Sequence, residues 1–332
     1  MQRIKQYILK RLGILKLRDD YSNAKIEINQ LKSERNQIRK DNQYLIREKR
    51  EIEHRLYDLE KIIENHFSGI NTEFYETRKP RIIVSLTSFP ARIDYVSKVI
   101  QRMLIQTVKP DEIILWLSLD QFPRKEDELP VSLLELKKYG VKIGWCEGDM
   151  KAYKKFLPVF KQYPDDLVII LDDDLTYHTD IVERLYRAHL QFPDAIIASR
   201  CHEIGMDEQG KISPYRTWRK ECENDTYEPK YDWFLTGGAG TLFPPHIFGP
   251  EMHEEEVIRE ICPWADDIWL NINAAMNHVP IVNVAGNNVL RRIEGTQEVR
   301  LEDINREQND IQLRNVVMYY KEKLIGTVYE NM

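Results

Sequence analysis

LVIILDDD, at residues 167–174, carries the clearest structural signal in this chain, because an apolar run leads directly into three carboxylates. A short apolar run of this kind is typical of a buried strand in a parallel sheet, where ligands bind beyond the carboxyl ends of the strands. Three adjacent carboxylates repel one another unless a positive charge lies among them, and a divalent cation that also holds phosphate oxygens is a common solution. The stretch therefore predicts a metal-assisted enzyme for a phosphorylated or nucleotide-linked substrate. The alternative is a solvated acidic turn that caps the next helix.

Strand and helix patterns alternate on both sides of this stretch. Apolar, β-rich runs predict strands at residues 81–86, 112–117, 141–145 and 167–171. Helical patterns lie between them, up to about residue 106, at residues 131–139 and at residues 152–163. This alternation is typical of a parallel sheet with right-handed crossovers. Polar residues follow each predicted strand and mark the expected ligand edge, at residues 87–92, 118–120, 146–149 and 172–174.

The alternation weakens beyond about residue 200. Residues 237–240 read GGAG between apolar flanks, which indicates either a close backbone approach to a ligand or a tight turn. Further on, the pattern predicts helices around residue 258, at residues 266–276 and over residues 301–323, with a strand at residues 279–284. We expect a mixed α/β protein as the fold class.

Length and composition limit the classes of protein to which the chain can belong. The chain has 332 residues, enough for one large or two ordinary domains, and its net charge of −6 gives no support to nucleic-acid binding. The four cysteines are scattered without a Cys-x-x-Cys pair, which argues against a zinc site or a disulfide framework and favours a reducing compartment. No apolar run approaches the ~20 residues of a membrane span, and no signal peptide is evident.

Residues 1–18 form a basic amphipathic segment. Ile4, Ile8, Leu12 and Leu15 fall on one helical face, with lysines and arginines around them. Such a helix can lie on an anionic membrane surface, and the alternative is a basic terminus that packs on its own protein.

Residues 19–67 are densely charged and carry a heptad pattern with two seam positions. The first position is polar in its middle and reads Ile28, Arg35, Asn42, Lys49, Leu56 and Ile63. The second is almost entirely apolar and reads Leu31, Ile38, Leu45, Ile52, Leu59 and His66. The pattern predicts a coiled coil, and a buried Asn42 favours a parallel two-stranded homodimer. The alternative is a single solvated helix that packs on the body. Residues 68–79 are expected to form a linker to a body at residues 80–332.

The arrangement of the body resembles the GT-A fold glycosyltransferases, near their large family-2-like bacterial group. The resemblance covers roughly residues 80–290. It rests on the Asp-x-Asp of residues 172–174 at the end of the fourth strand, on a glycine-containing half after it, and on the acidic pair that opens a helix in WADDIWL at residues 264–270. VSLTSFPARI at residues 84–93 is similar to the first nucleotide loop of such enzymes. The resemblance implies a Rossmann-like nucleotide-sugar half at residues 80–200, an acceptor half at residues 201–300 and a C-terminal helix at residues 301–332.

The resemblance also implies roles for the carboxylates. Asp172 and Asp174 would hold Mn²⁺ or Mg²⁺ on the donor diphosphate, with Asp174 the closer ligand and Asp172 or Asp173 facing the ribose. Asp267 would be the general base for the acceptor hydroxyl, with Asp266 as its neighbour, and the proximity of two like charges would raise one pKa of the pair. Helix capping is the alternative role for the pair.

Further residues are candidates for binding the nucleotide, each with a packing or surface role as its alternative. They are Thr87, Phe89, Arg92, Asp149 and Lys154, with Lys155 as an alternative to Lys154. A late histidine completes the metal site in many GT-A enzymes, but His278 does not match that position cleanly, which leaves the third protein ligand open.

These residues predict a metal-dependent glycosyltransferase that moves a sugar from a nucleotide-sugar donor, most simply a UDP-sugar, to a hydroxyl of a glycan or lipid-linked acceptor. We expect inversion, a role in surface polysaccharide synthesis and a cytoplasmic homodimer at the inner face of the membrane. One alternative is a haloacid-dehalogenase-like phosphotransferase with Asp172 as nucleophile and Asp174 as acid/base. The other is a coiled-coil scaffold with a degenerate transferase domain.

Overall fold

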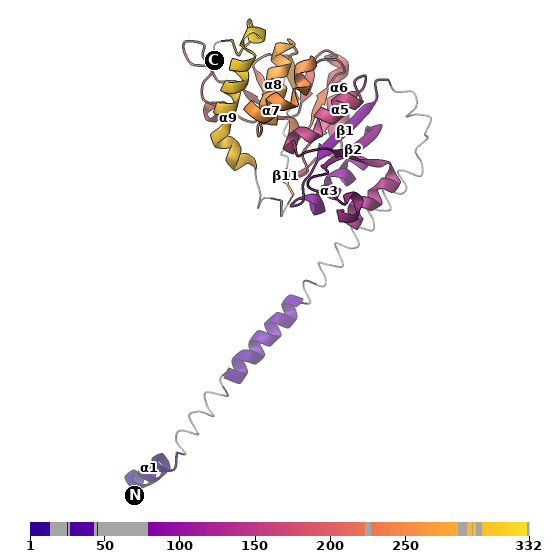
Figure 1. Cartoon of the computed structure of the whole chain (residues 1–332). Helices are drawn as coiled ribbons and strands as arrows, with labels where there is room; N and C mark the ends of the chain where they lie inside the picture. Colours follow the sequence, from indigo (N-terminus) through magenta and orange to yellow (C-terminus); the bar gives the residue numbers. More distant parts are fainter. Residues whose placement is uncertain are drawn as a thin grey trace. The chain divides into compact units, whose positions relative to one another are not determined.

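The computed structural model describes residues 1–13, 25, 27–42, 45, 79–222, 227–284, 291–293, 295–296, 301–330 and 332. The chain divides into two compact units, Met1–Gly69 and Ile70–Met332 (Figure 1). Within the described residues, no helix has both the length and the apolar character that a membrane span needs. All four cysteines are described, and each is a free thiol.

The described part of the first unit is helical. Helix α1 spans Gln2–Arg11 and buries none of its residues, and residues 27–42 form a second helix. Ile28, Leu31 and Ile38 of the predicted seam are 50%, 57% and 60% exposed on this single chain. The rest of the predicted coiled coil at residues 46–67 lies outside the described residues, as does Leu15, so the coiled coil stays a prediction.

A seven-stranded sheet in the order β10-β6-β9-β4-β1-β2-β3 forms the centre of the second unit. The strands are β1 (Ile82–Thr87), β2 (Glu112–Ser118), β3 (Val141–Cys146), β4 (Leu167–Leu171), β6 (Ile196–Ala198), β9 (Thr241–Phe243) and β10 (Ile281–Asn283). Strand β1 pairs in parallel with β2 and β4, β2 with β3, and β6 with β10, whereas β9 is antiparallel to β4 and β6. The mixed α/β class and the mostly parallel sheet expected from the sequence are confirmed.

Two small sheets and several helices complete this unit. The small sheets pair β5 (Leu175–Thr176) with β11 (Arg291–Arg292), and β7 (Cys201–Glu203) with β8 (Trp233–Leu235). The α-helices are α3 (Ile93–Leu104), α4 (Val131–Leu134), α5 (Leu157–Gln162), α6 (Ile181–Gln191), α7 (Glu255–Ile261), α8 (Asp266–Met276) and α9 (Leu301–Tyr319). Short 3₁₀ helices lie at Lys125–Glu128, Glu135–Tyr139, Lys151–Lys155, Tyr215–Thr217, Gly237–Ala239, Pro250–His253 and Lys321–Leu324. Figure 1 shows α8 and α9 side by side, and their residues contact each other.

Burial explains why the predicted strands form. All five residues of β4 and all seven of β2 are buried, as expected for strands covered on both faces. Helix α8 is also buried over most of its surface, and its Trp269 is fully enclosed. The predicted helices at residues 131–139 and 152–163 are shorter than expected, because each includes a 3₁₀ segment, Glu135–Tyr139 and Lys151–Lys155 respectively.

The order of the strands creates a switch point at β1. The chain adds β2 and β3 on one side of β1, and β4 then returns to the other side. Ligands of open α/β sheets bind at such a point, beyond the carboxyl ends of the two strands. Leu86 of β1 lies opposite Leu171 of β4, so the residues that follow both strands emerge at the same level. The acidic triplet is therefore directly beside the loop after β1.

Candidate active site

The loops after β1 and β4 are joined by polar contacts. The Ser88 hydroxyl donates to Asp173 Oδ2 at 2.6 Å, and Arg92 Nη1 donates to Asp173 Oδ1 at 3.0 Å. The same Arg92 nitrogen lies 3.1 Å from Asp174 Oδ2. Asp173 is only 5% exposed, and burial raises the pKa of its carboxyl to about 6 against the opposing effects of Arg92 and Ser88. Asp173 thus braces the loop, while its two neighbours are more accessible.

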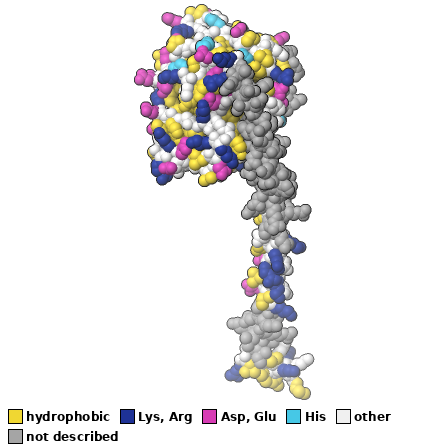
Figure 2. Space-filling view, turned by 90° about the vertical axis from the view of Figure 1, so that its right-hand side faces the viewer, with side chains coloured by type: hydrophobic (Ala, Val, Ile, Leu, Met, Phe, Trp, Pro, Cys, Tyr) yellow, Lys and Arg dark blue, Asp and Glu magenta, His cyan; other side chains and the backbone are white. Residues whose placement is uncertain are grey.

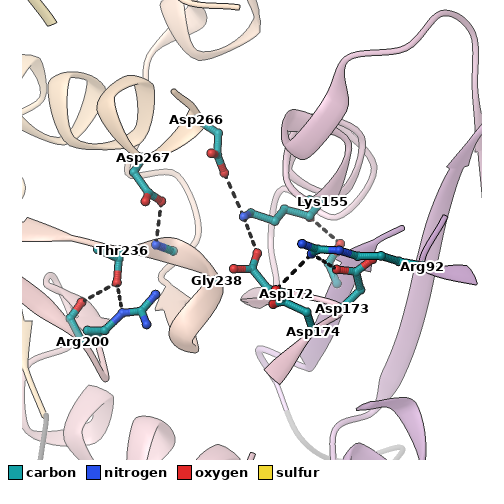
Figure 3. A network of polar contacts seen from close by, with 12 residues as sticks. Arg92, Lys155, Asp172, Asp173, Asp174, Arg200, Thr236, Gly238, Asp266 and Asp267 are labelled. Carbon is teal, nitrogen blue, oxygen red and sulfur yellow. Dashed lines mark hydrogen bonds and ion pairs between the residues drawn. The ribbon is translucent and has the colours of Figure 1, made fainter. Parts of the chain in front are cut away.

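Lys155 lies between the two groups of carboxylates that the sequence singled out. Its Nζ donates to Asp172 Oδ1 at 2.8 Å and forms an ion pair with Asp266 Oδ2, also at 2.8 Å. Figure 3 shows this lysine reaching from its 3₁₀ segment between Asp172, at the end of β4, and Asp266, at the start of α8. Burial opposes the charge on Lys155, but Asp172, Asp266 and Asp267 together hold its pKa well above the usual lysine value. Three carboxylates thus favour the charged form of this buried side chain.

Asp267 contacts the glycine-rich loop between β8 and β9. Its Oδ1 accepts a hydrogen bond from the Gly237 amide at 2.8 Å. Burial and the neighbouring Asp266 raise the pKa of Asp267, and Lys155 and the Gly237 amide reduce that rise. One turn further along α8, Asn271 exchanges two hydrogen bonds with the backbone of Leu235 and donates a third to the carbonyl of Asp267. The start of α8 is therefore fixed against β8.

The backbone of Gly238 contacts the Asp172 side chain. A Cβ atom at this position would lie 1.7 Å from Asp172 Oδ2, so only glycine fits. The Gly238 carbonyl accepts the Asp172 amide at 3.1 Å and also accepts the Tyr177 hydroxyl. The sequence indicated a close backbone approach at residues 237–240, and the structure places that approach on the carboxylate of Asp172.

The acidic side chains of this site can be compared with the ligands that a divalent cation needs. No group of three His, Cys, Asp or Glu side chains that could hold a metal ion occurs among the residues that the structure describes. Burial and the charge of Asp172 raise the pKa of Asp174, so these two carboxylates repel each other and a cation would relieve the repulsion. Mg²⁺ commonly takes one or two carboxylates together with substrate phosphate oxygens and water. Asp172 and Asp174 fit the protein part of a site of that kind, in which phosphate oxygens and water would supply the other ligands.

The remaining candidates for the nucleotide form a second group. Asp149 accepts a hydrogen bond from Lys154 Nζ at 2.6 Å and another from Gln121 Nε2 at 3.0 Å. Burial alone would raise the pKa of Asp149, but Lys154 and the Lys151 amide lower it below the usual value. Lys154 is 2% exposed, so it is a buried ion-pair partner and does not lie on a solvated helix face.

Three candidates at the end of β1 and in the loop after it are engaged within the fold. Thr87 donates its hydroxyl to the carbonyl of Trp116 on β2 at 2.7 Å. The guanidinium of Arg92 lies 5.5 Å from the centre of the Phe89 ring, which is partly exposed. The structure therefore brings Arg92 to the acidic triplet and leaves the Phe89 ring at the edge of this loop.

His278 does not belong to the acidic cluster. Together with Trp233 and Tyr329 it lines a cavity of about 160 Å³ near the far end of α8, where Ala274 and Ala275 also form the wall. Arg292 is on β11, which pairs with β5 directly after the triplet, and its charge lowers the pKa of Asp174. The late part of the chain thus supplies Arg292 near Asp174. His278 does not supply the third metal ligand that the sequence analysis left open.

Sequence reasoning did not single out several residues of this site. The Ser88 hydroxyl donates to Asp173, and the Tyr177 hydroxyl accepts the Asp172 amide and donates to the Gly238 carbonyl. Arg200 donates from Nε to the Thr236 hydroxyl at 2.6 Å beside the glycine-rich loop. The pairing of β7 with β8 brings Arg200 to Thr236. No local pattern around residue 200 indicates that pairing, so no sequence signal could have found Arg200.

Comparison with known proteins gives a distant structural likeness. No family model matches the chain, and no curated protein matches it. Staphylococcus aureus TarS residues 1–349 in complex with UDP is similar with a TM-score of 0.39 and 10% identity, over 74% of this chain and 69% of that one. A second structure of TarS 1–349 gives 0.40 and 9%, over 73% of each chain, and a structure of TarS gives 0.35 and 9%, over 62% and 36%. These values do not assign the chain to a family.

Proposed function

We propose that the protein is a glycosyltransferase that moves a sugar from a nucleotide-diphosphate donor to an acceptor hydroxyl. The observation that supports this most is the pairing of two acidic groups across a buried lysine. Asp172 and Asp174 lie at the switch point of the sheet, where a donor diphosphate is expected, and Asp266 and Asp267 open α8 next to the glycine-rich loop. The arrangement supplies a place for a leaving diphosphate and, beside it, a candidate base.

The chemistry divides between these two groups. A divalent cation at Asp172 and Asp174, when bound, would neutralise the leaving diphosphate. Arg92, fixed by Asp173 and Asp174, adds a permanent positive charge at the same edge. As the acceptor oxygen bonds to the anomeric carbon and the bond to the diphosphate breaks, Asp267 takes the hydroxyl proton. Its raised pKa suits a carboxylate that must accept a proton near neutral pH.

The finer assignments belong to the same proposal. We infer a UDP-sugar donor, attack with inversion, and an acceptor hydroxyl on a glycan or lipid-linked glycan of a surface polysaccharide. The support is the motif resemblance over residues 80–290 together with the exposed basic helix α1, which suits work at an anionic membrane surface in the cytoplasm.

Isothermal titration of UDP, with and without Mn²⁺, tests the proposal. The wild-type protein is expected to bind UDP in a Mn²⁺-dependent manner, and Asp174→Ala is expected to lose that dependence. Asp127→Ala is the matched control, because Asp127 is an exposed carboxylate on the 3₁₀ segment Lys125–Glu128. Absence of binding of UDP, GDP and CDP to the wild-type protein would contradict the proposal and favour the scaffold alternative.

The phosphotransferase alternative has less support. It requires its late acidic pair at the end of a strand, whereas Asp266 and Asp267 are the first residues of α8. It also requires its Asp-x-Asp at the end of the first strand of the domain, and β4 is preceded by β1, β2 and β3. A phospho-aspartate at Asp172 after incubation with a phosphoryl donor, without nucleotide binding, would reverse this preference.

A further inference from the structure

Two adjacent lysines of one 3₁₀ segment are buried, and each neutralises a different carboxylate. Lys154 pairs with Asp149, and Lys155 pairs with both Asp172 and Asp266. The Lys155 side chain is 4% exposed, whereas that of Asp172 is 36% exposed. The Asp172 carboxylate is therefore accessible to solvent, whereas its counter-ion Lys155 lies in the protein interior.

Both oxygens of Asp172 are already in contact with the protein. Oδ1 accepts the Lys155 ammonium at 2.8 Å, and Oδ2 lies so close to Gly238 that a Cβ there would be 1.7 Å away. A divalent cation that binds Asp172 must therefore compete with the ammonium of Lys155 for the same carboxylate. Asp266 offers the displaced ammonium a second partner, because its Oδ2 already lies 2.8 Å from Nζ.

We propose that Lys155 is a positioning residue that excludes divalent cations from Asp172 until the donor diphosphate arrives. This inference rests on the proposed function, since it needs a metal–nucleotide complex as the species that displaces Lys155. In the free enzyme the Lys155 ammonium binds the Asp172 carboxylate. The phosphate oxygens of the donor supply further ligands to the cation, and with them the cation binds tightly enough to displace the ammonium. Metal and nucleotide then bind as a coupled pair, because each raises the affinity of the protein for the other.

Binding of Mn²⁺ without nucleotide, followed by the electron paramagnetic resonance signal of the free ion, tests this coupling. Lys155→Met removes the charge at similar volume and is expected to bind Mn²⁺ about tenfold tighter or more than the wild type, the size of effect that one close counter-ion has on a carboxylate. Addition of UDP is expected to increase Mn²⁺ affinity less in this variant than in the wild type. Lys155→Arg keeps the charge and is expected to remain close to the wild type.

Lys161→Met is the control, because Lys161 carries the same charge on the neighbouring helix α5 but is exposed and outside the acidic cluster. It is expected to leave Mn²⁺ affinity in the absence of nucleotide unchanged. An equal gain in Lys161→Met would show that the loss of any nearby positive charge raises Mn²⁺ affinity, and would overturn the inference. So would an unchanged Mn²⁺ affinity in Lys155→Met when that variant still binds UDP.

A second variant keeps the test decisive if Lys155→Met fails to fold. Asp266→Asn preserves the shape of the side chain and leaves Lys155 with Asp172 as its remaining close partner. It is expected to weaken Mn²⁺ binding without nucleotide, the opposite sign to Lys155→Met, and tighter Mn²⁺ binding would overturn the inference. If the wild-type protein binds no nucleotide at all, the proposed function fails, whereas the Mn²⁺ affinities of these variants still report on Lys155.

Discussion

Two neighbouring aspartates at the start of α8 have different environments. Asp266 is 8% exposed and pairs with Lys155, whereas Asp267 is partly exposed and accepts only the Gly237 amide among its described hydrogen-bond donors. Burial and the neighbouring charge of Asp266 raise the pKa of Asp267, whereas Lys155 makes its ion pair with Asp266. The two identical side chains thus have different partners, Lys155 for Asp266 and the Gly237 amide for Asp267, which the sequence pattern could not distinguish.

Asp267 gives the first prediction, at the level of one carboxylate. Asp267→Asn should lower kcat by about 10²–10⁴-fold, the usual contribution of a general base, and leave UDP affinity unchanged. A carboxylate base acts only when ionised, so under the proposed function kcat/KM should rise with pH through the raised pKa of Asp267 and then level off. Asp266→Asn removes a like charge and should move this acidic limb to lower pH. If the pH–rate profile of Asp266→Asn matches that of the wild type, Asp267 is not the group whose ionisation produces the acidic limb.

At the level of elements, the loop between β8 and β9 connects the two acidic groups. The Gly237 amide binds Asp267, and Gly238 lies against Asp172. Gly238→Ala should displace the Asp172 carboxylate, and a displacement of about 1 Å can cost a site about 10²-fold in activity. We expect Mn²⁺-dependent UDP binding to weaken strongly in calorimetry. Gly210→Ala is the control, since Gly210 has open space around it and a positive φ of 75°, so it should lose some stability and retain UDP binding.

Helix α1 gives a prediction that does not depend on catalysis. Ile4 and Ile8 are 65% and 48% exposed, and the helix has basic residues in its last turn and no acidic residue in its first. Figure 2 shows hydrophobic and basic side chains together at this end of the chain. Since each basic side chain adds about 1 kcal/mol at an anionic surface, the full chain should float with vesicles that contain phosphatidylserine and not with pure phosphatidylcholine.

The control for this prediction compares apolar side chains at two places. Ile4→Ser combined with Ile8→Ser should abolish flotation, because the apolar face of α1 is lost. Val131→Ser combined with Leu190→Ser removes side chains that are 71% and 63% exposed on the second unit, and should float as the wild type does. Equal flotation of the α1 variant and the wild type would reject α1 as the membrane contact.

The sequence predicted the elements with strong local signals. The four parallel strands β1 to β4 and helix α8 form close to their expected bounds, because apolar runs and the acidic start of α8 are local features. The antiparallel strand β9 and the pairing of β7 with β8 were not predicted, since they depend on contacts between distant segments. The same limit applies to Lys155, because nothing in its neighbourhood distinguishes it from Lys154 until the fold places Asp172 and Asp266 beside it.

At the scale of the whole molecule, the acidic cluster illustrates how charge is balanced in the fold. Lys155 forms ion pairs with Asp172 and Asp266, and Arg92 forms ion pairs with Asp173 and Asp174. The net charge of −6 gives no indication of this local balance. A site with more negative than positive groups at the switch point suits a cationic ligand that arrives with phosphate oxygens, which is why nucleotide binding and metal binding are expected together.

The helical first unit predicts the oligomeric state of the whole molecule. Leu31 and Ile38 are 57% and 60% exposed at the same seam position of one heptad pattern, and a partner helix would remove this apolar surface from water. Light scattering after gel filtration should therefore give twice the 39.5 kDa mass of one chain. Leu31→Lys combined with Ile38→Lys should return the single-chain mass, because two like charges per helix would face each other across the seam. Gln30→Lys combined with Ser33→Lys adds the same charge outside the seam and should remain a dimer. A single-chain mass for the wild-type protein would contradict the coiled-coil dimer and favour a single solvated helix.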